Sequence, residues 1–375
     1  MTETNQKQKV LVAMSGGVDS AVAAKLLQMQ GHEVESVYVR TWEHENDLLG
    51  DCPGAKDLKD AEMVSKKLNI PFNVVNFIDF YRQEVVGPMV RGYAEGITPN
   101  PDILCNKQMK FGELMKYAKQ KGFDALATGH YCIQKFNHNQ EAELWEGADK
   151  NKDQSYFLAR LTKDQLSYAR FPLGRFKKPD TRKLAQESGF SVANKKDSQG
   201  ICFLGKVKVP EFLSHFIQPN PGDIVDKTGN KLGTHKGLHR YTLGQRKGIG
   251  IPSNTDHERF VVTGKDEAKN QLIVAFDRPE ESTLWANKYG LKQVRFITSQ
   301  LDQTREIKLL GKARYRDPST PIKLIPLEHQ NWIVEFQHPQ RALTPGQILA
   351  FYDGEQLVGS GIYSHSNLGR AAISS

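Results

Sequence analysis

Hydrophobic and polar positions follow two alternating periods over the first 130 residues. Short apolar runs at 9–14, 33–39, 72–77 and 125–128 have the length of buried strands. Between and after them, apolar residues recur at helical spacing over 19–30, 57–68, 79–95 and 106–121. Strands that alternate with helices predict an α/β fold, a parallel sheet with helices on both faces. Ligands of such a sheet bind at the carboxyl ends of its strands.

The pattern changes after about residue 205, where short strand-like stretches replace the helical ones. Segments 222–229 and 259–264 are typical of short strands bounded by glycine turns. Stretches at 312–316, 322–325, 332–336 and 348–352 then recur at a spacing that favours a small closed barrel. We therefore expect an α/β domain over 1–205, a β-rich middle domain over 206–285 and a C-terminal β barrel over 286–375.

The segment that joins the first strand to the first helix carries the clearest chemistry, Ser15-Gly16-Gly17-Val18-Asp19-Ser20. Two glycines let the backbone approach an oxyanion, and a helix N-terminus supplies free N–H groups and a favourable dipole. The segment lacks the lysine of the common nucleotide-binding P-loop and the three spaced glycines of dinucleotide-binding proteins. It resembles the pyrophosphate loop of the ATP pyrophosphatases, which transfer AMP to an oxygen of their substrate. An ordinary tight turn is the simpler alternative.

Cysteines are few, and two of the four lie in segments suited to reactive thiols. In Thr98-Pro99-Asn100-Pro101-Asp102-Ile103-Leu104-Cys105, two prolines stiffen a loop, and we expect a helix to begin near Cys105. The helix dipole would then lower the pKa of that thiol. Asp102 suits either a general acid or base, or a helix cap. Cys202, in Asp197-Ser198-Gln199-Gly200-Ile201-Cys202-Phe203, follows two lysines and also favours a reactive thiol.

The other two cysteines suggest no chemistry. Cys132 follows a strand-like pattern and fits a buried apolar role, whereas Cys52 lies in a loop rich in Gly, Asp and Pro and receives no role. No Cys-x-x-Cys pair occurs, which disfavours a zinc ribbon, and we expect no metal-ligating residues. Few cysteines, a polar start and no apolar run of membrane-spanning length predict a cytoplasmic protein without a membrane partner.

Basic residues exceed acidic ones, and the formal net charge is +8. Such a balance favours polyanionic partners. The cationic clusters are Arg175-Phe176-Lys177-Lys178, Lys195-Lys196, Arg246-Lys247 and Arg314-Tyr315-Arg316. Aromatic residues lie in or near several of them, as on nucleic-acid-binding surfaces, although a solvated face is an equally good interpretation of any single cluster.

Taken together, these motifs resemble those of one family, the tRNA-specific 2-thiouridylases, which modify the wobble uridine of certain tRNAs. The resemblance covers nearly the whole chain. Besides the glycine loop and the two cysteine segments, it rests on Ala127-Thr128-Gly129-His130-Tyr131, Asn151-Lys152-Asp153-Gln154-Ser155-Tyr156-Phe157, Tyr241-Thr242-Leu243-Gly244-Gln245-Arg246-Lys247-Gly248, Arg314-Tyr315-Arg316 and Thr344-Pro345-Gly346-Gln347.

The resemblance implies a role for individual residues. Cys105 would be the nucleophile, Cys202 the persulfide carrier and Asp102 a third catalytic residue. ATP would be held by Ala13, Met14, Ser15, Gly16, Gly17, Val18, Asp19, Ser20, Val39 and Gly129. The target base and the rest of the tRNA would meet Asn100, Pro101, Asp102, His130, Lys152, Asp153, Gln154, Arg314, Tyr315 and Gln347. One segment departs from the family's Met-Lys-Asn-Trp pattern, Val39-Arg40-Thr41-Trp42, so local substrate contacts there are less certain.

The implied reaction is ATP-dependent 2-thiolation of uridine, with Mg²⁺ and a persulfide-donating sulfur-carrier protein as further participants. The C2 oxygen would be adenylated, and sulfur from a cysteine persulfide would then replace it with release of AMP. Cys105 would either resolve the persulfide linkage, leaving a transient Cys105–Cys202 disulfide, or release hydrosulfide as the attacking species. Two rival interpretations are a synthetase that adenylates a small metabolite and a noncatalytic RNA-binding module on an old ATP fold. Both leave the two cysteine segments unexplained.

Overall fold

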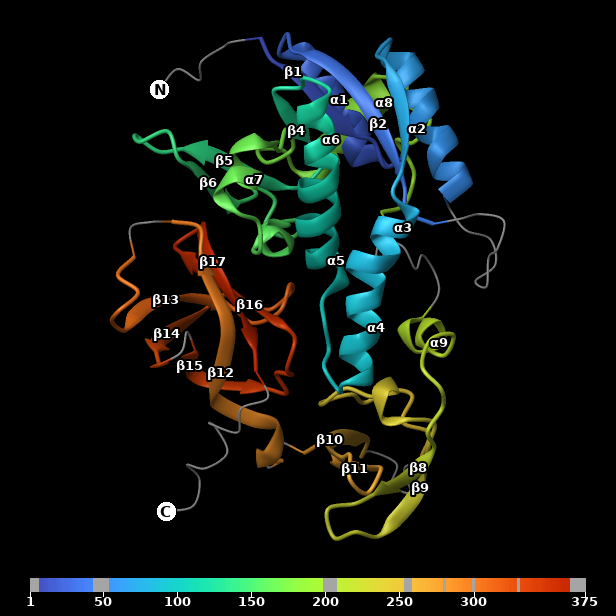
Figure 1. Ribbon diagram of the computed structural model, residues 1–375, viewed down its shortest axis with the longest axis vertical. Helices are drawn as coiled ribbons and strands as arrows, with labels where there is room; N and C mark the ends of the chain where they lie inside the picture. The colour runs from blue at the N-terminus through green and yellow to red at the C-terminus, as the bar shows by residue number, and fades with distance from the viewer. Residues whose placement is uncertain are drawn as a thin grey trace.

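The computed structural model describes residues 7–42, 54–197, 208–252, 258–278, 281–298, 301–328 and 331–364. Three sheets organise them, and Figure 1 shows a helix-rich upper part, a barrel below it on one side and a small sheet at the lower end. The helical segment that ends in α4 runs from the first sheet towards the small sheet. Within the described residues, no helix combines the length and the apolar character that crossing a membrane requires.

The first sheet is parallel and has the strand order β3-β2-β1-β4-β7. Its strands are β1 (Lys9–Ala13), β2 (Glu33–Arg40), β3 (Phe72–Asn76), β4 (Ala125–Ala127) and β7 (Ala169–Arg170). The first four fall within one residue of the apolar runs in the sequence, so the predicted parallel sheet is confirmed. The fifth was not predicted, because two residues are too few to give a periodic pattern.

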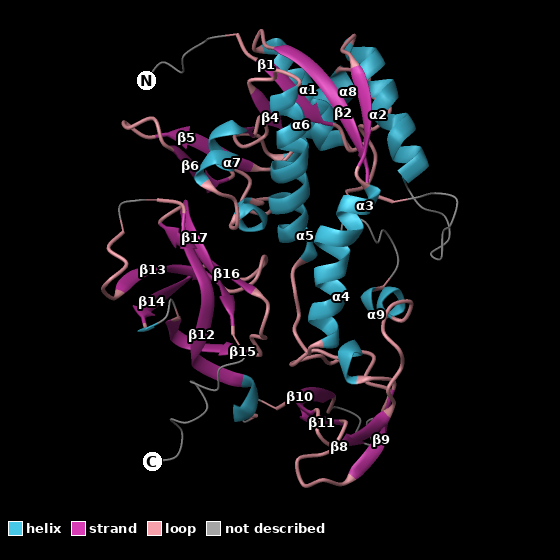
Figure 2. Ribbon diagram, in the orientation of Figure 1, coloured by secondary structure: helices cyan, strands magenta, loops and turns pink. Residues whose placement is uncertain are grey.

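Helices cover both faces of this sheet, as Figure 2 shows. One face carries α1 (Val18–Met29), α2 (Gly54–Leu68) and α8 (Lys178–Glu187). The other carries α7 (Lys163–Tyr168) and a helix formed by α5 (Pro101–Leu104), a π-helical stretch η2 (Cys105–Leu114) and α6 (Met115–Gln120). The remaining helical segments are α3 (Ile78–Tyr81), η1 (Arg82–Val86), α4 (Gly87–Ala94), η3 (Ser155–Leu158) and α9 (Val209–Leu213).

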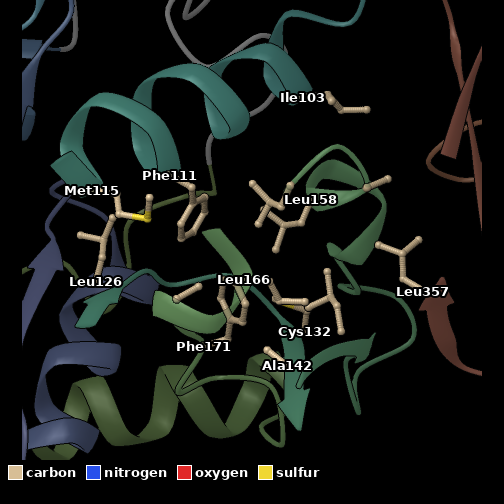
Figure 3. Close-up of a cluster of buried hydrophobic side chains, with 14 of the residues drawn as sticks. Ile103, Phe111, Met115, Leu126, Cys132, Ala142, Leu158, Leu166, Phe171 and Leu357 are labelled. Carbon is tan, nitrogen blue, oxygen red and sulfur yellow. The ribbon is translucent and has the colours of Figure 1, made fainter. Parts of the chain in front are cut away.

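Alternate residues of each central strand belong to different cores, as period-two geometry requires. Val10 and Val12 pack with the first group of helices, and Leu11 between them packs on the opposite face. Figure 3 shows the second core, in which Phe111, Met115 and Leu126 form one side and Cys132, Leu166 and Ala142 the other. Burial on both faces explains why the strands of this sheet are almost continuously apolar.

The middle sheet has four strands in the order β10-β11-β8-β9. They are β8 (Gly222–Val225), β9 (Lys231–His235), β10 (Phe260–Asp266) and β11 (Gln271–Phe276), with short 3₁₀ turns η4 (Leu238–Arg240) and η5 (Ser282–Leu284). Its small core contains Ile224, Val262 and Val274. The predicted β-rich middle region is therefore confirmed, while the boundary expected at residue 205 lies outside the described residues.

The C-terminal strands form a closed six-stranded barrel, as predicted. They are β12 (Trp285–Phe296), β13 (Ile307–Lys312), β14 (Thr320–Pro326), β15 (Trp332–Arg341), β16 (Ile348–Asp353) and β17 (Gln356–Tyr363), and β12 pairs with β17 to close the ring. A strand was expected over 312–316, but β13 ends at Lys312. The following residues turn, and an ion pair between Arg314 and Asp317 of 3.3 Å spans the turn.

A hairpin of the first domain extends the barrel sheet. Its strands are β5 (Cys132–Phe136) and β6 (Ala142–Glu146), and β6 pairs with β17 through Leu144 and Leu357. Two domains separate in sequence therefore share one sheet, which fixes the barrel beside the helix that carries Cys105.

Candidate active site

The glycine loop adopts a conformation that only glycine tolerates at its first glycine. Gly16 has φ of +72°, and a Cβ there would lie 2.2 Å from the carbonyl oxygen of Asp57. Gly17 is extended and precedes the first residue of α1. The loop therefore lies at the carboxyl edge of β1 with the N-terminus of α1 facing the same space, which is the arrangement that binds phosphates.

Serine hydroxyls hold the loop in shape. The Ser15 N–H donates to Ser20 Oγ at 3.1 Å, and Ser20 Oγ donates to the carbonyl oxygen of Gly17 at 3.1 Å. The two hydroxyl oxygens of Ser15 and Ser20 lie 3.2 Å apart. Ser20 is buried, and its hydroxyl makes hydrogen bonds within the loop. Ser15 is exposed to solvent.

The other residues expected at ATP lie around this loop. A Cβ on Gly129 would meet the backbone of Asp19 at 2.7 Å, so the segment after β4 packs directly against the start of α1. The Met14 N–H donates to the carbonyl oxygen of Val37 at 2.8 Å, and Val39 follows two residues later on β2. Ala13 and Val18 continue the strand and the helix on either side of the loop. The fold therefore brings all ten positions to one edge of the sheet.

Asp19 takes part in a partly buried charge network. Lys178 Nζ lies 2.8 Å from Asp19 Oδ1 and 2.7 Å from Asp197 Oδ1, and the Lys178 side chain is 9% exposed. The Tyr131 hydroxyl donates to Asp19 Oδ1 at 2.8 Å. Burial and the neighbouring Asp19 carboxylate raise the pKa of Tyr131 far above its usual range, so this hydroxyl remains a proton donor.

Two further groups of charges flank the loop. Lys195 Nζ donates to the carbonyl oxygen of Gly16 at 2.8 Å and contacts Asp57 and Asp60 at 2.7 and 2.5 Å. Asp197 also accepts from Lys152 at 2.7 Å and from Arg182 at 2.8 Å. Sequence reasoning missed the pairing of these residues. Lys178 and Lys195 did stand out as members of cationic clusters, but only the fold shows that their partners are carboxylates beside the glycine loop.

The helix that carries Cys105 begins earlier than expected. Asn100 Oδ1 accepts the Ile103 N–H at 3.1 Å, which makes Asn100 the N-cap, and Pro101 is the first helical residue. The expectation of a helix start near Cys105 is therefore wrong, and the capping interpretation of Asp102 is wrong as well. The dipole effect falls off within the first turn, so it acts on Asp102 and Ile103 more than on Cys105.

Cys105 is buried, with 2% of its surface exposed. It packs in an apolar cluster with Tyr81, Val86 and Met109, which Phe212 and Leu213 of α9 complete. Cys132 lies in the separate core under the parallel sheet, where burial raises the pKa of its thiol well above the usual value. The interpretation of Cys132 as a structural residue agrees with this burial. Cys52 and Cys202 lie outside the described residues.

Three residues expected at the tRNA are held by contacts within the protein. Asp153 is 5% exposed and accepts hydrogen bonds from Gly147 N and Ser155 Oγ at 3.0 and 2.9 Å. Gln154 Oε1 accepts the Tyr131 N–H at 3.0 Å. Lys152 makes the ion pair with Asp197 described above. His130 is also buried, and burial together with the charge of Lys110 lowers the pKa of His130 well below its usual value.

The barrel residues expected at the tRNA lie near the Cys105 helix. The ring of Tyr315 lies 4.3 Å from that of Phe157, whose carbonyl oxygen accepts Asn106 Nδ2 at 3.2 Å. The Thr98 N–H donates to the carbonyl oxygen of Pro345 at 2.9 Å, which joins the loop before Asn100 to the loop that contains Gln347. A cavity of about 420 Å³ lies between the barrel and the middle domain and is lined by Thr242, Leu243, Gly244, Gln245, Arg314, Arg341, Ala342 and Gln347.

Comparison with known proteins places these features in a family. Residues 8–206 match the family described as a tRNA methyl transferase HUP domain, 210–276 its PRC-barrel domain, and 287–363 an aminomethyltransferase beta-barrel domain. The tRNA-specific 2-thiouridylase MnmA of Akkermansia muciniphila is 43% identical over 95% of this chain and 98% of its own length. That of Lacticaseibacillus paracasei is 40% identical over 97% of each chain.

A solved 4-thiouridine synthetase in complex with RNA and ATP covers 53% of this chain and 46% of its own length. The two share 16% sequence identity at a TM-score of 0.33, which is too slight a likeness to support a statement about function. The match to the thiouridylases, by contrast, extends over all three sheets and both sides of the cavity. The chain belongs to the family of tRNA-specific 2-thiouridylases.

Proposed function

We propose that this chain is a sulfurtransferase that replaces the C2 oxygen of the wobble uridine of tRNA by sulfur and consumes ATP. The observation that carries the proposal is the likeness over nearly full length to relatives named for that reaction. The geometry supports it, because a phosphate-binding loop and the Cys105 helix belong to the same domain and the barrel lies beside that helix. A synthetase acting on a small metabolite would leave the barrel without a role.

In the first step, the C2 oxygen attacks the α-phosphate of ATP and pyrophosphate leaves. The N–H groups at the start of α1 and the exposed hydroxyl of Ser15 would stabilise the departing charge. Magnesium would neutralise the phosphates. Asp19 is the carboxylate of the loop, and Mg²⁺ in such sites uses one or two carboxylates together with substrate phosphates. Among the described residues, no cluster of three or more His, Cys, Asp or Glu side chains could hold a metal without those phosphates.

In the second step, the terminal sulfur of a Cys202 persulfide attacks C2, the C2–O bond breaks and AMP leaves. The Cys105 thiolate then attacks the Cys202 sulfur, which forms a Cys105–Cys202 disulfide and leaves sulfur on the base. In the alternative route, Cys105 attacks the persulfide first, and the released hydrosulfide attacks C2. Both routes end in the disulfide, so a thiol reductant must supply two electrons for each turnover. A sulfur-carrier protein would reload the persulfide.

Cys105 must become accessible for either route, because its thiol is buried in the apolar cluster with Phe212 and Leu213. We infer that tRNA binding displaces part of this cluster and places the base beside Asn100, Pro101 and Asp102. The wobble base lies in a single-stranded loop, so it can leave its stack at low cost. Arg314, Tyr315 and Gln347 would then hold the nucleic acid from the side of the barrel.

The direct test supplies the protein with ATP, Mg²⁺, a persulfide donor and unmodified tRNA, and measures 2-thiouridine by mass spectrometry. We expect thiouridine to form together with AMP. Cys202→Ala should abolish persulfide-dependent transfer while ATP still binds, and Cys105→Ser should also abolish it. Cys132→Ala is the matched control, because that thiol lies in a separate core. Absence of thiouridine with every sulfur source would refute the proposal, and activity of Cys202→Ala with a persulfide would refute the carrier role.

A further inference from the structure

Three cationic side chains converge on one carboxylate beside the glycine loop. Lys178 and Arg182 both contact Asp197 Oδ1, at 2.7 and 2.8 Å, and Lys152 contacts Asp197 Oδ2 at 2.7 Å. Lys178 also contacts the Asp19 carboxylate, so the three cations share two carboxylates and one positive charge is left over. Their convergence marks a place that suits an anion of higher charge, such as a phosphate or pyrophosphate.

The position of these cations relative to the loop supports such a role. Lys178 Nζ also contacts both carboxylate oxygens of Asp19, at 2.8 and 2.9 Å, so its ammonium group lies directly at the loop. Lys178 and Arg182 are four residues apart on α8, which places them on the same face of that helix. The helix packs on α1, whose N-terminus completes the loop.

Besides Asp197 and, for Lys178, Asp19, both cations also contact neutral groups. Arg182 Nη1 donates to the carbonyl oxygens of Ala193 and Lys195, at 2.8 and 3.0 Å. Lys178 Nζ lies 5.7 Å from the centre of the Tyr131 ring. These contacts fix the two nitrogen groups without neutralising them. Arg182 and Asp197 are 29% and 27% exposed, so a phosphate can reach them from solvent.

We propose that Lys178 and Arg182 bind the β- and γ-phosphates of ATP and the pyrophosphate that ATP yields, and that Asp197 competes with these phosphates for the two cations. The proposal rests on the use of ATP in the proposed function. It assigns a phosphate-binding role to two residues outside the glycine loop. Asp197 would thereby limit how tightly the product pyrophosphate is held, which favours its release after adenylation.

The test measures pyrophosphate binding to the full chain by calorimetry, with AMP as a second probe. Asp197→Asn should tighten pyrophosphate binding at least about threefold, and Arg182→Gln should weaken it about fivefold or more, as expected for one charge-assisted hydrogen bond. Neither change should alter AMP binding more than about twofold, because AMP lacks the β- and γ-phosphates. Lys183→Met is the matched control, since Lys183 lies on the same helix, is 75% exposed and pairs with Glu187 at the surface.

Lys178→Met should weaken pyrophosphate binding as well. Because the Lys178 side chain is nearly buried, this variant can also affect folding, so the test relies on the Arg182 and Asp197 variants. Thermal unfolding of each variant checks that it is folded. Unchanged or weaker pyrophosphate binding by Asp197→Asn would overturn the proposal, and so would unchanged binding by Arg182→Gln. If the wild-type chain makes thiouridine and these shifts are absent, only this inference fails. If the shifts occur and no thiouridine forms, only the proposed function fails.

Discussion

At the scale of single residues, His130 links the stability of the protein to pH. Its ring packs against Phe111 and Phe171, with centroids 6.3 and 6.2 Å away, and its Nδ1 lies 2.7 Å from Thr128 Oγ1. Burial keeps the ring neutral in the folded state. Unfolding restores a pKa of about 6.5, so below that pH the unfolded chain takes up a proton that the folded chain does not. Stability is therefore fully present above about pH 6.5 and decreases as the pH falls, by at most about 1.4 kcal/mol per pH unit.

Urea denaturation at about pH 7.5 and about pH 5.5 would check this prediction. The wild-type chain should lose about 1 kcal/mol more between the two pH values than His130→Gln, in which no imidazole titrates. His138→Gln is the control, because His138 is exposed in the turn between β5 and β6 and should behave as the wild type. Equal losses in the wild-type chain and in His130→Gln would contradict the prediction.

Within the candidate site, the sequence predicts the glycine loop well but does not predict which charged side chains pair with each other. The glycine loop was recognisable because its glycines serve local backbone geometry, which a short motif records. The ion pairs of Lys178 with Asp19 and of Lys195 with Asp57 join residues more than 130 positions apart, and no local pattern encodes such a pairing. Asp102 shows the opposite case. A helix cap was one of the two interpretations of Asp102, but Asn100 can also cap and lies directly before a proline that suits the first helical position.

At the scale of elements, the close packing of the segment after β4 against α1 depends on Gly129. A methyl group there would lie 2.7 Å from the backbone of Asp19, which cannot move without shifting the glycine loop. Gly129→Ala should therefore destabilise the protein by about 1–3 kcal/mol and weaken ATP binding at least tenfold, about the factor given by 1.4 kcal/mol. Gly264→Ala is the control, because a Cβ there would find its nearest neighbour at 3.5 Å, an ordinary contact.

Chemical denaturation and nucleotide titration of the two variants would decide the matter. If Gly129→Ala binds ATP as tightly as Gly264→Ala, the loop does not depend on this contact.

The elements themselves were largely predictable, since apolar runs buried on both faces of a sheet are conspicuous in a sequence. The expected strand over 312–316 failed because Arg314 and Tyr315 resemble a strand in composition, whereas their side chains serve a turn and a contact with Phe157.

At the scale of the whole molecule, a buried lysine joins the barrel to the catalytic domain. Lys312 at the end of β13 contacts Glu146 at 2.9 Å and Asp153 at 3.4 Å, and both carboxylates belong to the first domain. Removing the lysine leaves two largely buried carboxylates without this partner, at a cost of about 3–5 kcal/mol for a buried pair. We therefore expect Lys312→Met to destabilise the chain by about 3 kcal/mol.

The same contact predicts a specific rescue. Adding Asp153→Asn to Lys312→Met removes one of the two carboxylates that lost their lysine partner. The double variant should therefore lose less free energy of unfolding than the sum of the losses in the two single variants. Lys308→Met provides the control, because Lys308 lies on the same strand and is exposed. Urea unfolding of the four variants measures the coupling. Equal stabilities of Lys312→Met and Lys308→Met would show that the Lys312 ion pairs contribute nothing to the contact between the two domains.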